Sequence, residues 1–315
     1  MIDSFVKDLG TRIRENISKV IVGKEDVIDI ILVSLFSSGH VLLEDVPGVG
    51  KTMLAKCLAR SISSEFKRIQ FTPDLLPSDL SGINYYNQKQ GEFVFRKGPI
   101  FANIILADEI NRATPRTQSS LLECMEEKQV TIDGETKLLS EPFFVIATQN
   151  PVEIQGTFPL PEAQMDRFIV RIRMGYPSID EGKEILDRFQ SGSPYPSVEE
   201  VANASDIIKA QNEILSVKVG DAAKEYILNI VERTRNHDDI ILGVSPRGSI
   251  ALMKASQAYA ALNGRDFVTP DDIKYLAPYV LSHRLVIKGH AVTSGSDTAE
   301  DIIRRILNEI KVPVE

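Results

Sequence analysis

A short glycine-rich stretch followed by a lysine and a threonine is the part of this sequence best suited to chemistry. It comes after the apolar run Val41–Leu43 and before an apolar segment with helical spacing. Glycines let backbone N–H groups point at an anion, and a helix start adds partial positive charge, so this order of residues suits a phosphate-binding loop. Lys51 would reach the outer phosphates of a nucleotide, and the Thr52 hydroxyl would ligate Mg²⁺. The expected nucleotide-binding residues of this loop are Pro47, Gly48, Val49, Gly50, Lys51, Thr52 and Met53.

The loop departs from the usual pattern at one position. In the pattern Gly-x-x-x-x-Gly-Lys-Ser/Thr, the first glycine is replaced here by Asp45. An aspartate does not freely adopt positive φ, so the pattern does not predict the backbone at the start of the turn. A plain glycine turn between a strand and a helix is the alternative interpretation.

Two adjacent carboxylates follow a second apolar run. Asp108 and Glu109 come directly after Ile104–Ala107, which is typical of a buried strand. Ligands of open parallel sheets bind at the carboxyl ends of the strands, where both acids would lie. Asp108 would hold Mg²⁺ through water, and Glu109 would orient or deprotonate an attacking water molecule. The alternative is an acidic, solvated strand end.

One amide side chain follows a third apolar run. Asn150 comes after Phe143–Thr148, so it would also lie at the carboxyl edge of the sheet. There its amide could hydrogen-bond both a γ-phosphate and the attacking water. An asparagine before a proline, here Pro151, is equally typical of a simple turn, and the local residues do not separate the two interpretations.

Two arginines are candidates for binding phosphate. Arg247 follows Ser245-Pro246, which looks like an N-cap and a first helical residue, so its cation lies where the helix dipole is positive. An anion such as a γ-phosphate would explain this position, and a surface arginine is the alternative. Arg167 ends a short helical segment and could reach the γ-phosphate of a neighbouring subunit. From the residues alone, a salt-bridged arginine at a helix end is the simpler interpretation.

A parallel sheet would bring these residues together, and the residue pattern predicts one. The expected strands are His40–Leu43, Phe66–Phe71, Phe101–Ala107, Phe143–Thr148 and Ile169–Ile172. The expected helices are Val6–Val20, Asp26–Ser37, Met53–Ser63, Arg116–Glu126 and Glu162–Phe168. Unbroken apolar strands suit a sheet that helices cover on both faces. Two insertions interrupt the alternation: Leu75–Pro99, which is too polar and turn-rich for a helix, and a hairpin around Asp133-Gly134.

A boundary between two units is expected near Ser191–Ser197, which is rich in serine, proline and glycine. Strand signals are scarce after this segment. The expected helices beyond it are Ala222–Asn236, Pro246–Leu262, Pro270–Leu281 and Thr298–Ile310. We therefore expect an α/β nucleotide-binding domain over residues 1–190 and a smaller, all-helical domain over residues 191–315.

Composition and charge narrow the classes of function. The 315 residues are 43% hydrophobic and 25% charged, as in ordinary globular proteins, and the net charge of −8 argues against nucleic acid as a partner. Cys57 and Cys124 are far apart and are expected to be buried free thiols. No segment approaches the roughly 18 apolar residues of a membrane span, and the N-terminus lacks the apolar core of a signal peptide, so we expect no membrane insertion and a cytoplasmic location.

Taken in order along the chain, these motifs resemble those of the AAA+ ATPases, and within them the MoxR family. Val20–Lys24 is similar to the adenine-side segment of that family, which adds Val22 and Gly23 to the expected nucleotide-binding residues. Residues 48–52 resemble its Walker A loop, and residues 107–113 its Walker B region. Phe71–Asp79 and Gly98–Asn103 are similar to MoxR proteins in particular. The resemblance covers nearly the full chain, and the order of the motifs is more specific than any one of them.

The resemblance implies roles that the residues alone left open. It implies ATP and Mg²⁺ as cofactors, Asn150 as sensor 1 and Arg247 as sensor 2 in the same site, and Arg167 as an arginine finger that reaches a neighbouring subunit. It also implies a P-loop α/β domain with a helical lid, assembled into a ring, usually a hexamer. The segment Leu75–Pro99 and the Asp133-Gly134 hairpin are similar to the helix 2 and pre-sensor 1 insertions of this clade.

The implied function is ATP hydrolysis by a molecular chaperone that matures or metal-loads other protein complexes, with von Willebrand factor A domain proteins as partners. Two alternatives from other classes remain. A nucleotide-gated scaffold with little turnover is disfavoured by the pair Asp108 and Glu109, and a nucleic-acid motor of related fold is disfavoured by the acidic charge. The sequence identifies neither the client nor the ring size, the turnover rate or the need for a partner.

Overall fold

The sheet at the centre of the molecule consists of five parallel strands. In spatial order they are β2 (Phe66–Gln70), β5 (Ile104–Asp108), β8 (Phe144–Gln149), β1 (Val41–Glu44) and β9 (Val170–Ile172). The predicted parallel sheet is confirmed. The structure is a computed structural model that describes residues 5–89, 91–150, 156–288 and 298–313, so Pro151 lies outside the described residues.

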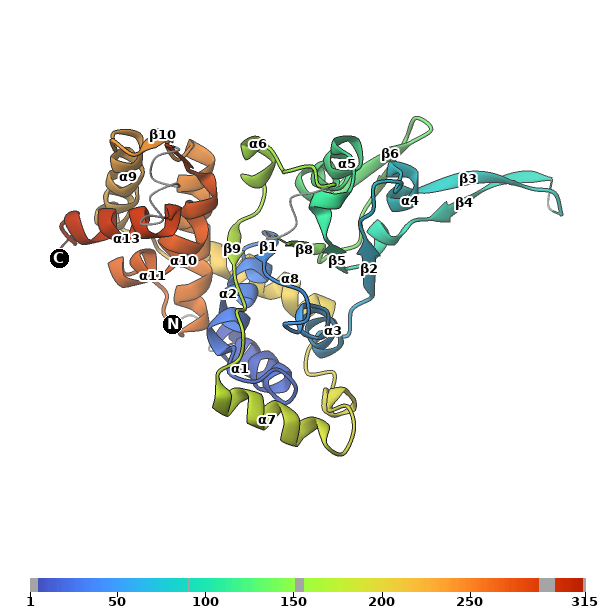
Figure 1. Cartoon of the computed structure of the whole chain (residues 1–315), viewed down its shortest axis with the longest axis horizontal. Helices are drawn as coiled ribbons and strands as arrows, with labels where there is room; N and C mark the ends of the chain where they lie inside the picture. The colour runs from blue at the N-terminus through green and yellow to red at the C-terminus, as the bar shows by residue number, and fades with distance from the viewer. Residues whose placement is uncertain (1–4, 90, 151–155, 289–297, 314–315) are drawn as a thin grey trace.

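Helices cover both faces of the sheet (Figure 1). The helices α1 (Phe5–Ser18), α2 (Glu25–Phe36) and α3 (Lys51–Ser61) share one apolar core with the strands, and α5 (Pro115–Glu127) belongs to a second core. In β5, Ile104 and Leu106 pack in the first core, whereas Ile105 and Ala107 pack in the second. Because both of its faces are buried, β5 is apolar from Ile104 to Ala107, as the sequence indicated, whereas the edge strand β2 contains the exposed residues Lys67, Arg68 and Gln70.

Most predicted bounds lie within two residues of those in the structure, and two predicted elements differ by three residues at one end. Strand β5 begins at Ile104 rather than Phe101, because the turn η1 (Pro99–Phe101) precedes it. Helix α6 (Glu162–Met165) ends before the predicted Phe168. The carbonyl of Phe168 accepts a hydrogen bond from the Arg284 guanidinium (2.8 Å) instead of a helical N–H, and the Phe168 side chain is fully buried. Residues 166–169 therefore form a turn after α6.

The first insertion contains a short helix and a long hairpin, so the prediction of no helix in residues 75–99 is wrong. Helix α4 (Pro77–Ser81) begins with proline, and Asp79 accepts a hydrogen bond from the Leu76 N–H (2.9 Å), which caps its start. Strands β3 (Gly82–Asn87) and β4 (Glu92–Lys97) then pair antiparallel and project from the body as an arm (Figure 1).

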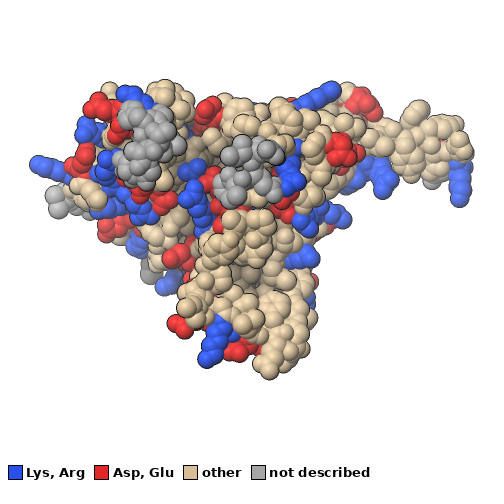
Figure 2. Space-filling view, in the orientation of Figure 1, with Lys and Arg blue, Asp and Glu red and all other residues tan. Residues whose placement is uncertain are grey.

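The arm exposes apolar side chains along much of its length. Ile83, Tyr85, Tyr86 and Phe93 are all exposed, and the rings of Tyr86 and Phe93 meet edge to face at 5.4 Å. Figure 2 shows mostly uncharged surface along the arm and basic residues at its tip. An exposed apolar surface of this kind is typical of contact sites.

The second insertion is the predicted hairpin. Strands β6 (Gln129–Ile132) and β7 (Glu135–Leu138) pair antiparallel around Asp133 and Gly134. Both turn residues have positive φ, +49° and +84°, which matches the twist of the flanking strands.

The last helices of the chain form a helical unit on one side of the sheet, as predicted, whereas the first two helices after β9 lie beside the N-terminal helices (Figure 1). Among the described residues, the helices after β9 are α7 (Ile179–Phe189), α8 (Ala204–Glu213), α9 (Asp221–Arg235), α10 (Pro246–Leu262), α11 (Pro270–Leu281) and α13 (Ala299–Glu309). A short antiparallel ladder of β10 (Ile240–Leu242) and β11 (Val286–Ile287) accompanies them. Helix α8, which follows the expected boundary at 191–197, packs against α1 and α2.

Two further expectations concern thiols and membrane spans. Cys57 and Cys124 are both buried free cysteines, as predicted, and burial raises the pKa of each thiol to about 12.

Within the described part of the chain, no helix combines the length and the apolar character needed to cross a bilayer.

A buried histidine joins the start of β1 to two other elements. The Nδ1 atom of His40 accepts a hydrogen bond from the Val145 N–H (3.1 Å), and its Nε2 atom donates one to the Met125 carbonyl (3.0 Å). The first bond requires the neutral ring, because a protonated Nδ1 atom cannot accept a hydrogen bond. Burial lowers the pKa of His40 to about 4.

This histidine should make the protein less stable in acid. The pKa of His40 is about 4 in the folded chain and about 6.5 when exposed, so between these values only the unfolded chain takes up the proton. The free energy of unfolding should therefore decrease as the pH falls through this window. Urea unfolding at several pH values should show a smaller decrease for His40→Gln than for the wild type. His237→Gln, at a half-buried position, is the control, and equal pH dependence in all three proteins would contradict the assignment.

Candidate functional site

The predicted site residues meet where three neighbouring strands end. The phosphate loop follows β1, Asp108 ends β5, and Asn150 follows β8. These residues line one pocket of about 410 Å³. Its full lining is Pro47, Gly48, Gly50, Lys51, Thr52, Met53, Lys56, Arg68, Asp108, Glu109 and Asn150.

The phosphate loop has the backbone that its glycines permit. Gly48 and Gly50 have φ values of +87° and +96°, and α3 begins directly afterwards at Lys51. Apart from its chain neighbours, no atom of the described residues lies within 4 Å of the place that a Cβ would take at Gly48, so this side of the loop presents open backbone. Asp45 is not among the described residues with positive φ. The first position of the motif therefore does not need a glycine in this chain.

The ammonium group of Lys51 lies among oxygens at the base of this loop. Its Nζ atom donates a hydrogen bond to the Asp45 carbonyl (2.9 Å). Burial lowers the pKa of Lys51, although Asp108, Asp45 and Glu109 act in the opposite direction. An anion bound in the loop would favour the charged form further, because it would lie beside a partly desolvated cation.

Neighbouring strands hold the two acids. Asp108 accepts hydrogen bonds from Arg68 Nη2 on β2 (2.5 Å) and from the Thr148 hydroxyl on β8 (2.7 Å). The Thr148 oxygen in turn accepts one from the Glu109 N–H (2.8 Å). Asp108 and Thr52 line the same pocket and offer the oxygen ligands that Mg²⁺ prefers, so these residues fit this metal.

Glu109 has a backbone conformation that is rare outside glycine. Its φ is +57°, in the left-handed region. Its carboxylate accepts a hydrogen bond from Gln70 Nε2 at the end of β2 (2.8 Å) and pairs with Arg112 Nε (3.0 Å). The arrangement keeps a carboxylate beside the phosphate loop, where it can act as a general base.

A second and more apolar pocket, of about 240 Å³, adjoins the first. Gly48, Gly50 and Met53 line both pockets. Val22 lines the apolar pocket, whereas Gly23 lies against the Glu181 side chain. The pocket suits a flat ring such as adenine. The other residues of its lining are Val20, Ile21, Lys24, Val49, Met174, Gly175, Pro177, Ile185 and Phe189.

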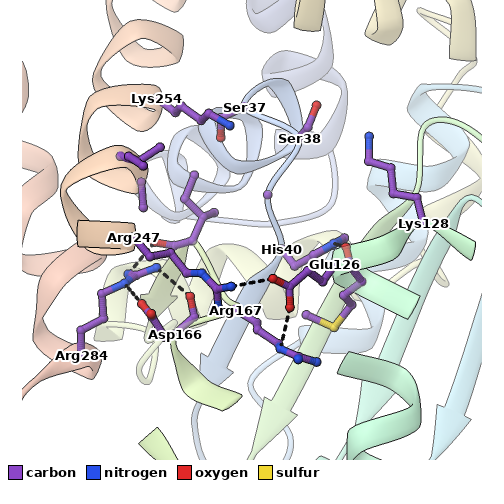
Figure 3. Close-up of a pocket in the computed structure, with 15 residues that line it drawn as sticks. Ser37, Ser38, His40, Glu126, Lys128, Asp166, Arg167, Arg247, Lys254 and Arg284 are labelled. Carbon is purple, nitrogen blue, oxygen red and sulfur yellow. Dashed lines mark hydrogen bonds and ion pairs between the residues drawn. The ribbon is translucent and has the colours of Figure 1, made fainter. Parts of the chain in front are cut away.

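Both predicted arginines lie at a third pocket, also of about 240 Å³ (Figure 3). Glu126 of α5 pairs with each of them, at 3.0 Å from Arg167 Nε and 2.5 Å from Arg247 Nη2. In this structure Arg247 therefore lies away from the pocket of its own phosphate loop, and its role in that site stays a prediction. A cation in the first turn of α10 does have an anionic partner, but that partner is the carboxylate of Glu126.

An ion pair between the buried Arg284 and the partly buried Asp166 connects the segments that carry the two arginines. Asp166 accepts hydrogen bonds from Arg284 Nε (2.6 Å) and from Ser245 Oγ (3.1 Å). Asp166 directly precedes Arg167, and Ser245 is the N-cap of α10, which carries Arg247. Burial lowers the pKa of Arg284, and the charge of Asp166 acts in the opposite direction. Removal of either member of a buried pair leaves an unpaired charge, so this contact locks the helical unit to the turn after α6.

Sequence reasoning missed the residues that hold these groups, namely Arg68, Gln70, Glu126, Thr148 and Asp166. The sequence could have indicated Gln70 and Thr148, because both lie at the ends of strands that flank β5. Glu126 carried none. It lies on α5, and its two partners come from distant segments of the chain.

Comparisons with known proteins agree with this architecture. Residues 40–170 match the family described as "ATPase family associated with various cellular activities (AAA)", and residues 232–306 match the AAA lid domain. The chain is 56% identical to Uncharacterized protein YeaC of Bacillus subtilis over 96% of this chain and 94% of that protein. It is 40% identical to Chaperone MoxR1 of Mycobacterium tuberculosis over 94% of this chain and 80% of that protein. The crystal structure of a candidate ATPase from Cytophaga hutchinsonii is similar, with a TM-score of 0.91, 40% identity, and coverage of 98% and 96% of the two chains.

The hydroxyl of Thr148 should matter for metal-dependent binding, because it contacts both Asp108 and Glu109. Thr148→Val keeps the shape of the side chain but removes these hydrogen bonds, whereas Thr148→Ser keeps the hydroxyl. We expect about tenfold weaker binding of ATP in the presence of Mg²⁺ for the valine variant and little change for the serine variant. Titration of a fluorescent ATP analogue with Mg²⁺ or with EDTA would measure this. Wild-type affinity in the valine variant would contradict the role of Thr148.

Proposed function

This chain belongs to the MoxR family of AAA+ ATPases, and we propose that it hydrolyses ATP with Mg²⁺ in a ring of subunits. The observation that supports hydrolysis most is that Lys51, Thr52, Asp108 and Glu109 line one pocket. In this proposal one cavity would hold a phosphate cradle, metal ligands and a general base.

The proposed binding mode uses both adjoining pockets. Adenine would occupy the apolar pocket near Val22 and Gly23, and the phosphates would lie over residues 48–52. The Thr52 hydroxyl and, through water, the Asp108 carboxylate would hold the metal. Bound Mg²⁺ would neutralise charge on the outer phosphates.

Glu109 is the proposed general base. Its carboxylate would take a proton from the water that attacks the γ-phosphorus, as the bond to the bridging oxygen of ADP breaks. Asn150 would orient that water and the γ-phosphate. The hydrogen bonds that Glu109 receives from Gln70 and Arg112 would set the direction of its carboxylate.

Arg167 and Arg247 are proposed to act together on the nucleotide of a neighbouring subunit. Both lie at the pocket that contains Glu126, which is distinct from the pocket of their own phosphate loop. A γ-phosphate carries more negative charge than the Glu126 carboxylate and accepts more hydrogen bonds, so it can replace Glu126 as their partner. A closed ring, proposed to be the hexamer usual for the family, would give every nucleotide such a neighbour.

The proposed role of the ring is that of a cytoplasmic chaperone in the maturation or metal loading of partner complexes. The relative named Chaperone MoxR1 supports a chaperone in general terms. Von Willebrand factor A domain proteins are the proposed partners. The arm β3–β4 and the hairpin β6–β7, which exposes Leu138, are the proposed contact surfaces.

A nucleotide-gated scaffold with little turnover is the second candidate. The observation that favours it is that Gln70 and Arg112 both bind the carboxylate of Glu109 in this structure. In a scaffold these contacts would persist when ATP binds. In a hydrolase at least one lone pair of the carboxylate would serve the water.

Glu109→Gln should bind ATP but hydrolyse it at least about 100-fold more slowly, because the amide cannot accept the proton. Phosphate release from concentrated protein, with ATP binding measured in parallel, would test this. Glu127→Gln on the exposed end of α5 is the control. Normal turnover in Glu109→Gln would exclude this base, and no turnover in the wild type would favour the scaffold.

Mixed rings should reveal which subunit supplies each arginine. Arg167→Ala subunits mixed with Lys51→Ala subunits should regain activity, because some interfaces then combine an intact phosphate loop with an intact arginine pair. Arg247→Ala mixed with Lys51→Ala should regain activity for the same reason. Arg167→Ala mixed with Arg247→Ala should not, because neither subunit carries both arginines.

The opposite pattern would place Arg247 in the site of its own chain. In that case Arg247→Ala with Lys51→Ala would stay inactive, and Arg167→Ala with Arg247→Ala would recover. Size-exclusion chromatography with light scattering, on differently tagged subunits, would establish that mixed rings form before activity is measured.

A further inference from the structure

Asp45 occupies the position where the phosphate-loop motif has a glycine, and its side chain is buried and hydrogen-bonded. It is 7% exposed, and one carboxylate oxygen accepts hydrogen bonds from the N–H groups of Met174 and of Gly175, the latter at 3.1 Å. Two successive N–H groups that converge on one oxygen form an anion-binding concavity. Gly175 has φ of +65°, a conformation that favours glycine. The carboxylate of Asp45 therefore fills a backbone anion site shortly after β9.

The main chain of Asp45 contacts the phosphate side of the site. Its N–H donates a hydrogen bond to the carbonyl of Gln149 (3.1 Å), the residue before Asn150. Its carbonyl accepts the hydrogen bond from Lys51 Nζ (2.9 Å). One residue thus joins the end of β8, the phosphate-binding lysine and the segment after β9.

The segment that Asp45 holds is one wall of the apolar pocket. Met174 and Gly175 line this pocket together with Gly48 and Gly50 of the phosphate loop. The Met174 methyl group lies 3.9 Å from the place that a Cβ would take at Gly50. A ligand that fills both pockets therefore contacts the phosphate loop as well as Met174 and Gly175. The hydrogen bonds of Asp45 connect these two segments.

We propose that Asp45 is a positioning residue that sets the spacing between the base pocket and the phosphate loop. This inference rests on the proposed nucleotide site. A glycine at position 45 would keep the main-chain bonds but leave the N–H groups of Met174 and Gly175 without their acceptor. The loop itself would stay intact, while the base-side wall would lose its fixed place relative to it.

The proposal predicts a difference between two kinds of ligand. A ligand that spans both pockets gains affinity from their fixed spacing, because neither part has to be brought into place on binding. A ligand that contacts only the phosphate loop does not gain from this spacing. If Asp45 served folding alone, its replacement would lower the thermal stability and would weaken the binding of both ligands equally.

The experiment compares ADP with inorganic tripolyphosphate, both with Mg²⁺, in competition with a fluorescent ADP analogue. Asp45→Gly should weaken ADP binding about tenfold and tripolyphosphate binding by less than about twofold. Asp45→Asn keeps an accepting oxygen and should retain most of the ADP affinity. All measurements are made well below the melting temperature of each variant.

Gly175→Ala tests the same contact from its other side. An alanine Cβ there meets no atom within 4 Å, but φ of +65° is strained for alanine, so the paired N–H groups should move. This variant should show the same selective loss of ADP affinity, and it decides the question if Asp45→Gly does not fold. Equal losses for both ligands, or unchanged ADP binding in Asp45→Gly and Gly175→Ala, would overturn the proposal. A wild-type protein that binds neither ligand would instead contradict the nucleotide site itself.

Discussion

The hydrogen bonding of the parallel sheet determines where every group of the nucleotide pocket lies. Because all five strands point the same way, the loop after β1, the acids at the end of β5 and the amide after β8 must share one edge. Strand β8 lies between β5 and β1, so Thr148 can contact both Asp108 and Glu109. Strand β2 lies on the other side of β5 and brings Arg68 and Gln70 to the same acids. Pairing between strands, rather than closeness in sequence, assembles the pocket.

Residue patterns predict the parts of the structure that depend on local or periodic order. Unbroken apolar runs predicted the buried strands, and from them the place of Asp108. The short helix α4 was missed because its five residues lie in a polar segment, although Pro77 and Asp79 are ordinary start signals. The dipole argument at Arg247 correctly required an anion but could not identify it. Glu126 supplies that anion from α5, and such a long-range contact leaves no trace in local spacing.

A buried arginine couples the helical unit to the sheet. Arg284 follows α11 and binds the carboxylate of Asp166 and the carbonyl of Phe168, in the turn that contains Arg167. Removal of Asp166 would leave the buried Arg284 guanidinium without its counter-charge, so the helical unit and this turn should move as one body. Since α10 carries Arg247 and is capped by Ser245, which also binds Asp166, a displacement of the helical unit would carry both arginines together.

The ion pairs at the third pocket differ in how easily they can change partner. The Arg284 side chain is 2% exposed, whereas Arg167 and Arg247 are 29% and 48% exposed. Partly exposed pairs contribute only about 0–1 kcal/mol, so the exchange of Glu126 for a more highly charged phosphate costs little. The buried pair with Asp166 would stay closed during this exchange. The fold thus separates one contact that is hard to break from two that are easier to break. In the proposed ring, this difference would let Arg167 and Arg247 bind Glu126 in the free subunit and a second subunit's nucleotide after assembly.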